Sequence, residues 1–259
     1  MTRHTLKWFA TPLLLAVLIA IWEIYVRAFS VSPFILPSPA EVGVALIDVL
    51  SDPKTYYQIW VTLFETIAGF LIAVAIGVLL GGLLGKLRWL ETTISPLIVG
   101  LQVMPKVALI PLFIVWFGFG ITSKVVLAAV IAFFPIMTNT ILGIKSVERG
   151  HRDVMQCLNA GRWETFRDVE FPNALPYILT GMEVGIVLAT IGAIVGEYLG
   201  GSEGLGYMAV ATLNAFDVQR MFAVIVLLTL LGLILYFAVV MLRRRLTPWH
   251  QSVSTDARI

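Results

Sequence analysis

Cysteine is almost absent from this 259-residue chain, which has a single one, Cys157. One cysteine cannot form an internal disulfide, and it excludes a thiolate metal cluster. The three histidines, His4, His151 and His250, all lie outside the apolar segments, so we expect no buried histidine-based metal or catalytic site. The formal net charge of +2 is too small to indicate nucleic acid binding.

Charged residues are also scarce: they make up 13% of the chain, whereas hydrophobic residues make up 59%. Soluble domains have about 25% charged and about 45–50% apolar residues, so this composition indicates an integral membrane protein. No paired carboxylates, nucleophile–base set or metal-ligand cluster converges in the apolar segments, which argues against an enzyme. The chain also lacks a G-x-x-x-x-G-K-[ST] phosphate loop, so we do not expect it to hydrolyse nucleotides or to bind a cofactor itself.

Six apolar runs are present, and each has about the 20 residues that a helix needs to cross a bilayer. Helices are expected because a helix satisfies its own backbone polar groups in lipid. The first run follows Arg3 and Lys7 without a convincing A-x-A cleavage site, so we interpret it as an uncleaved signal anchor. The fold class is therefore predicted as an all-α, multi-pass membrane protein with six transmembrane helices. The runs are 8–29, 60–84, 94–119, 125–144, 177–199 and 221–242.

The positions of lysine and arginine predict the orientation of these helices. If the N-terminus is cytoplasmic, 13 of the 18 basic residues lie on the cytoplasmic side. The five others are Arg27, Lys54, Lys106, Lys124 and Arg220. We therefore expect both termini inside the cell, together with the segment 145–176.

The second run has small residues at every fourth position, a pattern that lets two helix backbones approach closely in lipid. The partner helix can lie in this chain or in a second copy. Glu65, near the outer end of the same run, is interpreted as an interfacial or snorkelling residue rather than a substrate ligand. The small residues are Gly69, Ala73, Gly77, Gly81 and Gly85.

Prolines at 96, 105 and 111 are expected to break the third run. Gln102 and Lys106 lie in this interrupted region; they either line a pathway or lie near the membrane surface, where Lys106 snorkels. In the fourth run, Thr138, Asn139 and Thr140 either bond neighbouring helices, which we favour, or face a pore. Gln102, Lys106, Thr138 and Asn139 are thus the candidate pathway-lining residues.

Two segments outside the spans have turn-forming sequences. In ILPSPAEV (residues 35–42), Ser38 is suited to cap a helix and Pro39 to occupy its first position. In GGSEGLGY (residues 200–207), four glycines predict tight turns or close backbone contact.

The segment 145–176 is polar and has ten charged residues between two apolar runs. Its hydrophobic spacing predicts two short amphipathic helices. The first is expected to stop at Asn159, a residue that tolerates positive φ at a helix C-terminus. The second contains Trp163 and Phe166 and is expected to end at Phe171-Pro172. Short helices are only marginally stable in water, and exposing aromatic rings to water is unfavourable. This segment is therefore a candidate for contact with a soluble partner.

This segment resembles the cytoplasmic loop of binding-protein-dependent permeases, the membrane subunits of bacterial ABC importers. Their signature is Glu-Ala-Ala, three residues, Gly, nine residues and Ile-x-Leu-Pro. It falls here on Asp153-Val154-Met155, Asn159 and the tetrapeptide at 169–172, with only Pro172 identical. ILPSPAEV, ALIPLFIVWFGFG, FPNALPYILTG and GEYLGGSEGLGY resemble the nitrate/sulfonate/taurine branch of that family.

The resemblance implies that this chain is a permease in the bacterial inner membrane and that its loop between helices 4 and 5 is a coupling helix. It implies a homodimer with two cytoplasmic ATPase subunits, which hold ATP and Mg²⁺, and an extracytoplasmic solute-binding protein. Membrane lipid surrounds the complex. The implied ATPase-coupling residues are Asp153, Val154, Met155, Asn159, Ala160, Gly161, Arg162, Trp163 and Phe166.

We divide the chain into residues 1–59 (first helix and external segment), 60–245 (permease domain) and 246–259 (cytoplasmic tail). A small anion or a small heterocycle is the expected solute. An ion-gradient-driven transporter is one alternative, although ionisable residues near mid-membrane are few. A membrane scaffold is the second alternative, but a scaffold needs neither proline-broken helices nor small-residue seams.

Overall fold

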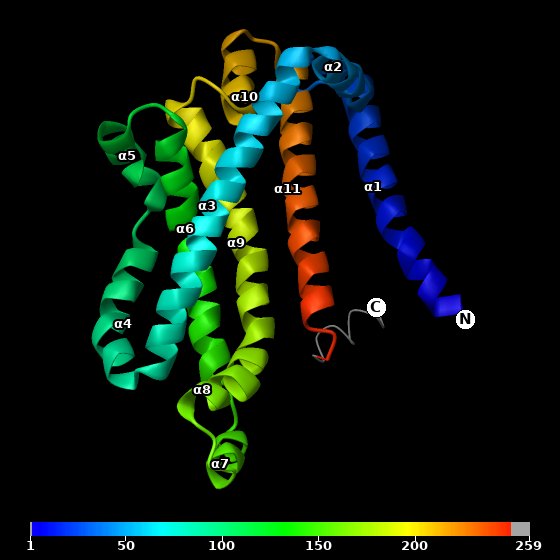
Figure 1. Ribbon diagram of the computed structural model, residues 1–259. Helices are drawn as coiled ribbons and strands as arrows, with labels where there is room; N and C mark the ends of the chain where they lie inside the picture. Colours follow the sequence, from blue (N-terminus) through cyan, green and yellow to red (C-terminus); the bar gives the residue numbers. More distant parts are fainter. Residues whose placement is uncertain (1, 250–259) are drawn as a thin grey trace.

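The chain forms a bundle of helices in a computed structural model that describes residues 2–249, with side chains from residue 10 onward except that of Arg149 (Figure 1). The described residues form no strand, which confirms the all-α expectation. Residues 250–259, which include His250 and most of the expected tail, lie outside the described part. The helices are α1 (Thr2–Ala28), α2 (Pro39–Ser51), α3 (Pro53–Lys86), α4 (Arg88–Val103), α5 (Ile110–Phe117), α6 (Ile121–Lys145), α7 (Arg149–Cys157), α8 (Arg162–Thr165), α9 (Phe171–Gly200), α10 (Leu205–Asn214) and α11 (Val218–Leu246).

Five helices in the described residues are long and apolar enough to cross a membrane. They correspond to five of the six predicted spans. Helices α3, α6, α9 and α11 extend past the predicted boundaries because helical hydrogen bonding continues into the polar residues that flank each apolar run. The five are Ala10–Ala28, α3, α6, Arg162–Gly200 and α11.

The predicted third span is a bent pair: α4 and the segment Lys106–Phe117, which begins with a 3₁₀ turn, meet at 84°. The break lies at Met104 and Pro105, where the residue before proline leaves the helical region (ψ 128°). The prediction that Pro96 and Pro111 also break the helix is wrong. Pro96 lies inside α4, and Pro111 lies in the first turn of α5, where a missing N–H removes no helical bond.

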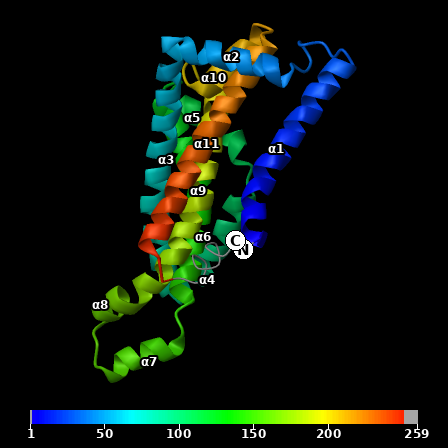
Figure 2. The same ribbon diagram turned by 90° about the vertical axis from the view of Figure 1, so that its right-hand side faces the viewer.

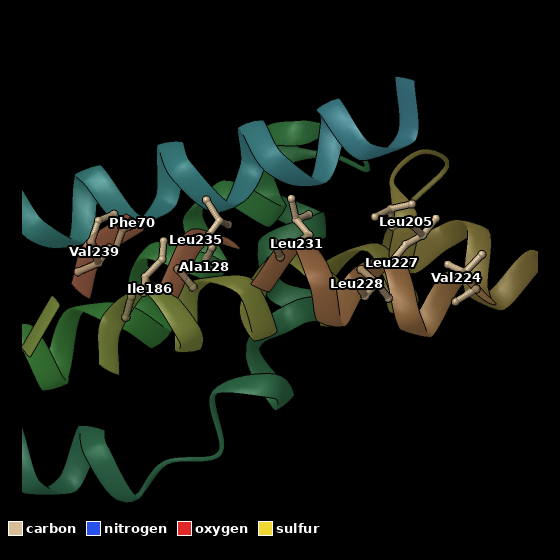
Figure 3. Close-up of a cluster of buried hydrophobic side chains, with 14 of the residues drawn as sticks. Phe70, Ala128, Ile186, Leu205, Val224, Leu227, Leu228, Leu231, Leu235 and Val239 are labelled. Carbon is tan, nitrogen blue, oxygen red and sulfur yellow. The ribbon is translucent and has the colours of Figure 1, made fainter. Parts of the chain in front are cut away.

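Helices α3, α6, α9 and α11 pack around one apolar core. Figure 3 shows Phe70 of α3, Ala128 of α6, Ile186 of α9 and Leu235 of α11 within it. The small residues of α3 face α6 of the same chain: a Cβ atom added at any of its four patterned glycines would lie within 3.0 Å of α6. Of the two alternatives for the partner of this seam, the structure shows the intrachain one.

Two adjacent glycines of α3 allow a matched test of this packing. A Cβ atom at Gly81 would lie 2.7 Å from the carbonyl oxygen of Met137, whereas one at Gly82 would meet nothing within 4 Å. We expect Gly81→Ala to lower the free energy of unfolding by about 1–3 kcal/mol, since overpacking forces backbone shifts. Gly82→Ala is the control and is expected to change it little. Detergent-induced unfolding of both variants measures the difference, and equal stabilities would contradict the close α3–α6 contact.

Helices α2 and α10 lie at the same end of the bundle, opposite α7 and α8 (Figures 1 and 2). Ser38 caps α2 as predicted: its hydroxyl accepts from the Glu41 N–H, the Glu41 carboxylate accepts from the Ser38 N–H, and Pro39 begins the helix. Helix α1 stands apart from the bundle (Figure 2), and only 6% of its apolar stretch within Ala10–Ala28 is buried.

The second helix of the polar segment does not end at Phe171-Pro172, as the sequence predicted. Helix α8 passes through a π-helical turn (Phe166–Glu170) into α9, so that Arg162–Gly200 is continuous. Pro172 does not end the helix because it follows the π-helical turn, and such local adjustments accommodate the backbone bond that a proline removes. The polar segment is therefore a short helix, a tight turn and the extended start of a membrane helix.

Candidate functional site

The turn between α7 and α8 is the feature that gives the polar segment its shape. Asn159 has a φ of 54°, as predicted. Beside it, the N–H of Ala160 donates to the carbonyl of Met155 at 3.0 Å. The left-handed conformation of Asn159 brings the Ala160 N–H to a carbonyl at the end of α7, which would otherwise lack a partner. The chain consequently reverses within a few residues.

Gly161 begins α8 with an extended backbone (φ −69°, ψ 165°), so its conformation does not require glycine. Its N–H donates to the Glu164 carboxylate at 2.8 Å, and the Thr165 hydroxyl donates to its carbonyl at 3.0 Å. Glu164 thus satisfies a backbone donor that a helix start would leave unpaired. The turn is held by its own backbone bonds and by the side chains of Glu164 and Thr165.

Charged residues attach this unit to the membrane helices. Glu170 pairs with Lys86 of α3 at 3.0 Å and with Arg152 of α7 at 3.4 Å. The Arg152 guanidinium also donates to the Ile144 carbonyl at the end of α6 (3.1 Å). Lys86 lies 4.0 Å from the centre of the Phe166 ring. The ends of α3 and α6 therefore hold both α7 and the start of the 39-residue helix.

The nine candidate coupling residues fall into two groups. Those around the turn project from the bundle (Figure 2). Val154 and Trp163 are 57% and 70% exposed, and the neighbouring Leu158, which is not one of the nine, is 71% exposed. Three large apolar side chains are thus exposed outside the predicted membrane spans. Phe166, in contrast, is half-buried between Trp163 and Phe171. The projecting members are Asp153, Val154, Asn159, Gly161, Arg162 and Trp163, with Met155 and Ala160 half-buried beside them.

Three of the four pathway candidates lie together at the bend between α4 and the 3₁₀ turn. The Gln102 side chain donates to the Thr138 hydroxyl at 3.3 Å, and Lys106 Nζ donates to the Gln102 carbonyl at 2.9 Å. Lys106 also lies 5.0 Å from the Phe134 ring centre. Asn139 is not part of this group, because its side chain packs beside Gly181 of α9.

The favoured expectation that Thr138, Asn139 and Thr140 bond neighbouring helices is wrong for most of these groups. Each side chain donates to the carbonyl four residues earlier in α6, at 2.7–2.9 Å. Polar side chains commonly satisfy themselves in this way within a helix. Among the hydrogen bonds of the described residues, Thr138 alone of the three also bonds another helix, through Gln102.

A buried polar cluster, made of Thr62, Glu65, Lys124 and Glu197, lies at the end of the bundle that carries α10. Lys124 of α6 pairs with Glu65 of α3 at 3.2 Å. The Glu197 carboxylate of α9 accepts from the Thr62 hydroxyl and from the Gly206 N–H, both at 2.6 Å. All four residues are at most 3% exposed. The interpretation of Glu65 as an interfacial residue is therefore wrong.

This cluster also explains the glycine-rich segment before α10. Gly204 has a φ of 102°, and a Cβ atom there would lie 2.0 Å from Glu197. The Leu205 N–H donates to the Thr62 hydroxyl at 2.8 Å. The glycines thus permit the backbone to close over the Glu197 carboxylate. Helix α10 is fixed to α3 and α9 by these bonds.

A second ion pair joins α9 to α11: the buried Glu183 and the half-buried Arg243 are 2.7 Å apart. Glu65 and Glu183, each of which lies in an apolar run and would disfavour an anionic solute if it faced the pathway, are therefore both paired within the chain. Sequence reasoning missed these pairs because the partners are distant along the chain. The available signal was that ionisable residues in apolar runs are costly in lipid and need a partner.

The chain belongs to the family described as "binding-protein-dependent transport system inner membrane component", whose model matches residues 73–248. It is thus the permease subunit of an ABC importer, a multi-pass inner-membrane protein. The family description implies a solute-binding protein and an ATPase as partners.

The chain is 37% identical to the formylaminopyrimidine transport permease ThiX of Halalkalibacterium halodurans over 90% of its length and 93% of that protein. It is 31% identical to the putative aliphatic sulfonates transport permease SsuC of Bacillus subtilis over 96% of its length and 91% of that protein. Its fold is similar to a chain of the inward-facing MetNI methionine ABC transporter (TM-score 0.66, 22% identity, covering 76% of this chain and 99% of that one).

Proposed function

We propose that α7 and the turn that follows it form the coupling helix, which docks into a cleft on a separate cytoplasmic ATPase. The observation that supports this most directly is the projecting surface around Asn159, where Val154, Leu158 and Trp163 are exposed. Covering such apolar side chains removes them from water, which lowers the free energy and favours binding. Bound ATP and Mg²⁺ belong to the ATPase in this proposal, and the permease supplies only the docking surface.

Both termini are cytoplasmic in this proposal. The end of the bundle that carries α7 also has Lys86, Arg88, Lys145 and the three arginines at 243–245. A cluster of basic residues at the ends of membrane helices favours the cytoplasmic side. The opposite end, with α2 and α10, is then the surface that the solute-binding protein reaches.

The continuous helix Arg162–Gly200 connects the two ends. Its 39 residues span about 58 Å at 1.5 Å per residue. It begins in the docking surface and reaches Glu197, which holds the start of α10. A displacement of the loop by the ATPase is therefore transmitted along one helix to the outer end of the permease.

Two copies of the chain form the pathway in this proposal, and Gln102, Lys106 and Thr138 are its polar candidates, with Asn139 set apart from them. A small anion, such as a sulfonate, or a small heterocycle is the solute, since both classes are named for relatives. Lys106 is compatible with an anion because Glu65 and Glu183 are each paired with a basic residue. Selectivity resides mainly in the binding protein.

The lone cysteine provides a direct test of the orientation, because Cys157 is exposed at the end of α7. A membrane-impermeant maleimide is expected to label it in inside-out vesicles and not in intact spheroplasts. In the assembled importer, labelling is expected to slow, because the ATPase covers α7.

The matched control moves the thiol to the other end of the bundle. In a Cys157→Ser background, Ser51→Cys places an exposed thiol at the end of α2. Its labelling is expected to show the reverse pattern. Labelling of Cys157 from outside the cell would contradict the proposed orientation, and unchanged labelling in the assembled importer would contradict docking at α7.

A further inference from the structure

An apolar groove runs between α3 and the start of α9. Its cavity has a volume of about 600 Å³, within the range of small-molecule sites. Val78, Gly82 and Lys86 follow one face of α3 at four-residue intervals, and Phe166, Phe171 and Ile178 line the facing side. Val78, Gly82 and Ile178 belong to the predicted spans 60–84 and 177–199, so this end of the groove lies at the depth of the hydrocarbon, where a water-soluble partner does not reach.

A second cavity of about 440 Å³ adjoins the groove at the α7 end and shares Lys86, Ile144 and Arg162 with it. Its charged lining consists of Lys86, Arg152, Arg162 and Glu170. Glu170 pairs with Lys86 and Arg152. In the described part of the chain, no carboxylate pairs with Arg162. The cavity thus has three cationic groups and one anionic group at the edge of the membrane.

We propose that the groove and this cavity together bind one anionic phospholipid, with an acyl chain against α3 and α9 and the phosphate near Lys86 and Arg162. A cationic pocket between membrane helices at the cytoplasmic surface is the arrangement that recognises anionic headgroups. The excess positive charge is complementary to phosphate. It disfavours a second copy of the chain, whose helices end in lysines and arginines at the same level.

Gly82 is the position at which the groove can be closed without disturbing the fold. A Cβ atom there meets nothing within 4 Å, since the space beside it is the groove itself. Gly100 of α4 is equally open but lies outside the groove. Leucine at each position adds the same side chain, in one case inside the groove and in the other outside it.

The test is native mass spectrometry of the delipidated full chain, titrated separately with phosphatidylglycerol and phosphatidylcholine. We expect one tightly held phosphatidylglycerol per chain, bound about tenfold more tightly than phosphatidylcholine, since each basic group near the surface strengthens anionic lipid binding. Gly82→Leu is expected to abolish this binding, and Gly100→Leu to retain it. Arg162→Gln is expected to weaken the binding of phosphatidylglycerol about fivefold and to leave the binding of phosphatidylcholine unchanged.

Equal binding of the two lipids, or undiminished binding by Gly82→Leu, would overturn the proposal. The same spectra report the oligomeric state. A dimer that Gly82→Leu dissociates would show that a second copy occupies the groove, and would also overturn it. None of these results depends on the ATPase, so failure of the lipid site is distinguishable from failure of the proposed coupling function.

Discussion

Replacing Gly161 by tryptophan is expected to abolish solute-stimulated ATP hydrolysis and transport while the chain still inserts into the membrane. Gly161 lies in the projecting turn, and a Cβ atom there approaches only Glu164, at 3.7 Å. The indole therefore extends outward into the space that the ATPase occupies in the proposed complex. Loss of a central interface contact of this kind typically costs at least 2 kcal/mol, so we expect transport to fall by about 30-fold or more.

Gly161→Ala is the matched control for this experiment. Because the backbone of Gly161 is extended rather than left-handed, alanine fits and is expected to retain most of the transport. ATP hydrolysis is measured in reconstituted importer with solute-loaded binding protein, and the amount of membrane-inserted chain is measured in parallel. Normal stimulation of the tryptophan variant would contradict docking at this turn.

Replacing Lys124 by methionine is expected to be among the most destabilising single changes in the described part of the chain. Lys124 is 3% exposed and is paired with Glu65, which is fully buried. Its removal leaves a buried carboxylate without its partner, which typically costs about 3–5 kcal/mol. The free energy of unfolding, measured by titration of the purified chain with sodium dodecyl sulfate, is expected to fall by this amount.

The double variant Lys124→Met, Glu65→Leu distinguishes loss of the pair from loss of packing. Buried ion pairs replaced as a whole by apolar residues often cost little, so the double variant is expected to recover most of the stability. A double variant that is no more stable than Lys124→Met alone would show that the cluster stabilises the chain through Glu197 rather than through the pair.

The candidate coupling surface could be predicted largely from local sequence, since its determinants are local. Asn159 is suited to a left-handed position after a short helix, and its φ of 54° follows. The end of the second short helix could not be predicted in the same way. Phe171-Pro172 is a typical stop signal, but a π-helical turn just before the proline lets a membrane helix continue through it. Packing of Phe166 under Lys86 favours the continuous helix.

The membrane spans, the capped start of α2 and the small-residue seam of α3 were determined by the sequence itself. Each depends on a periodicity or a cap that a few neighbouring residues define. The partners of Glu65, Glu183 and Glu197 were decided only by the tertiary structure. Lys124, Arg243 and Thr62 lie on other helices, and a single sequence does not specify which faces of two helices meet. Which charges are buried and which are paired depends on how the helices pack, so both are decided only when the bundle is assembled.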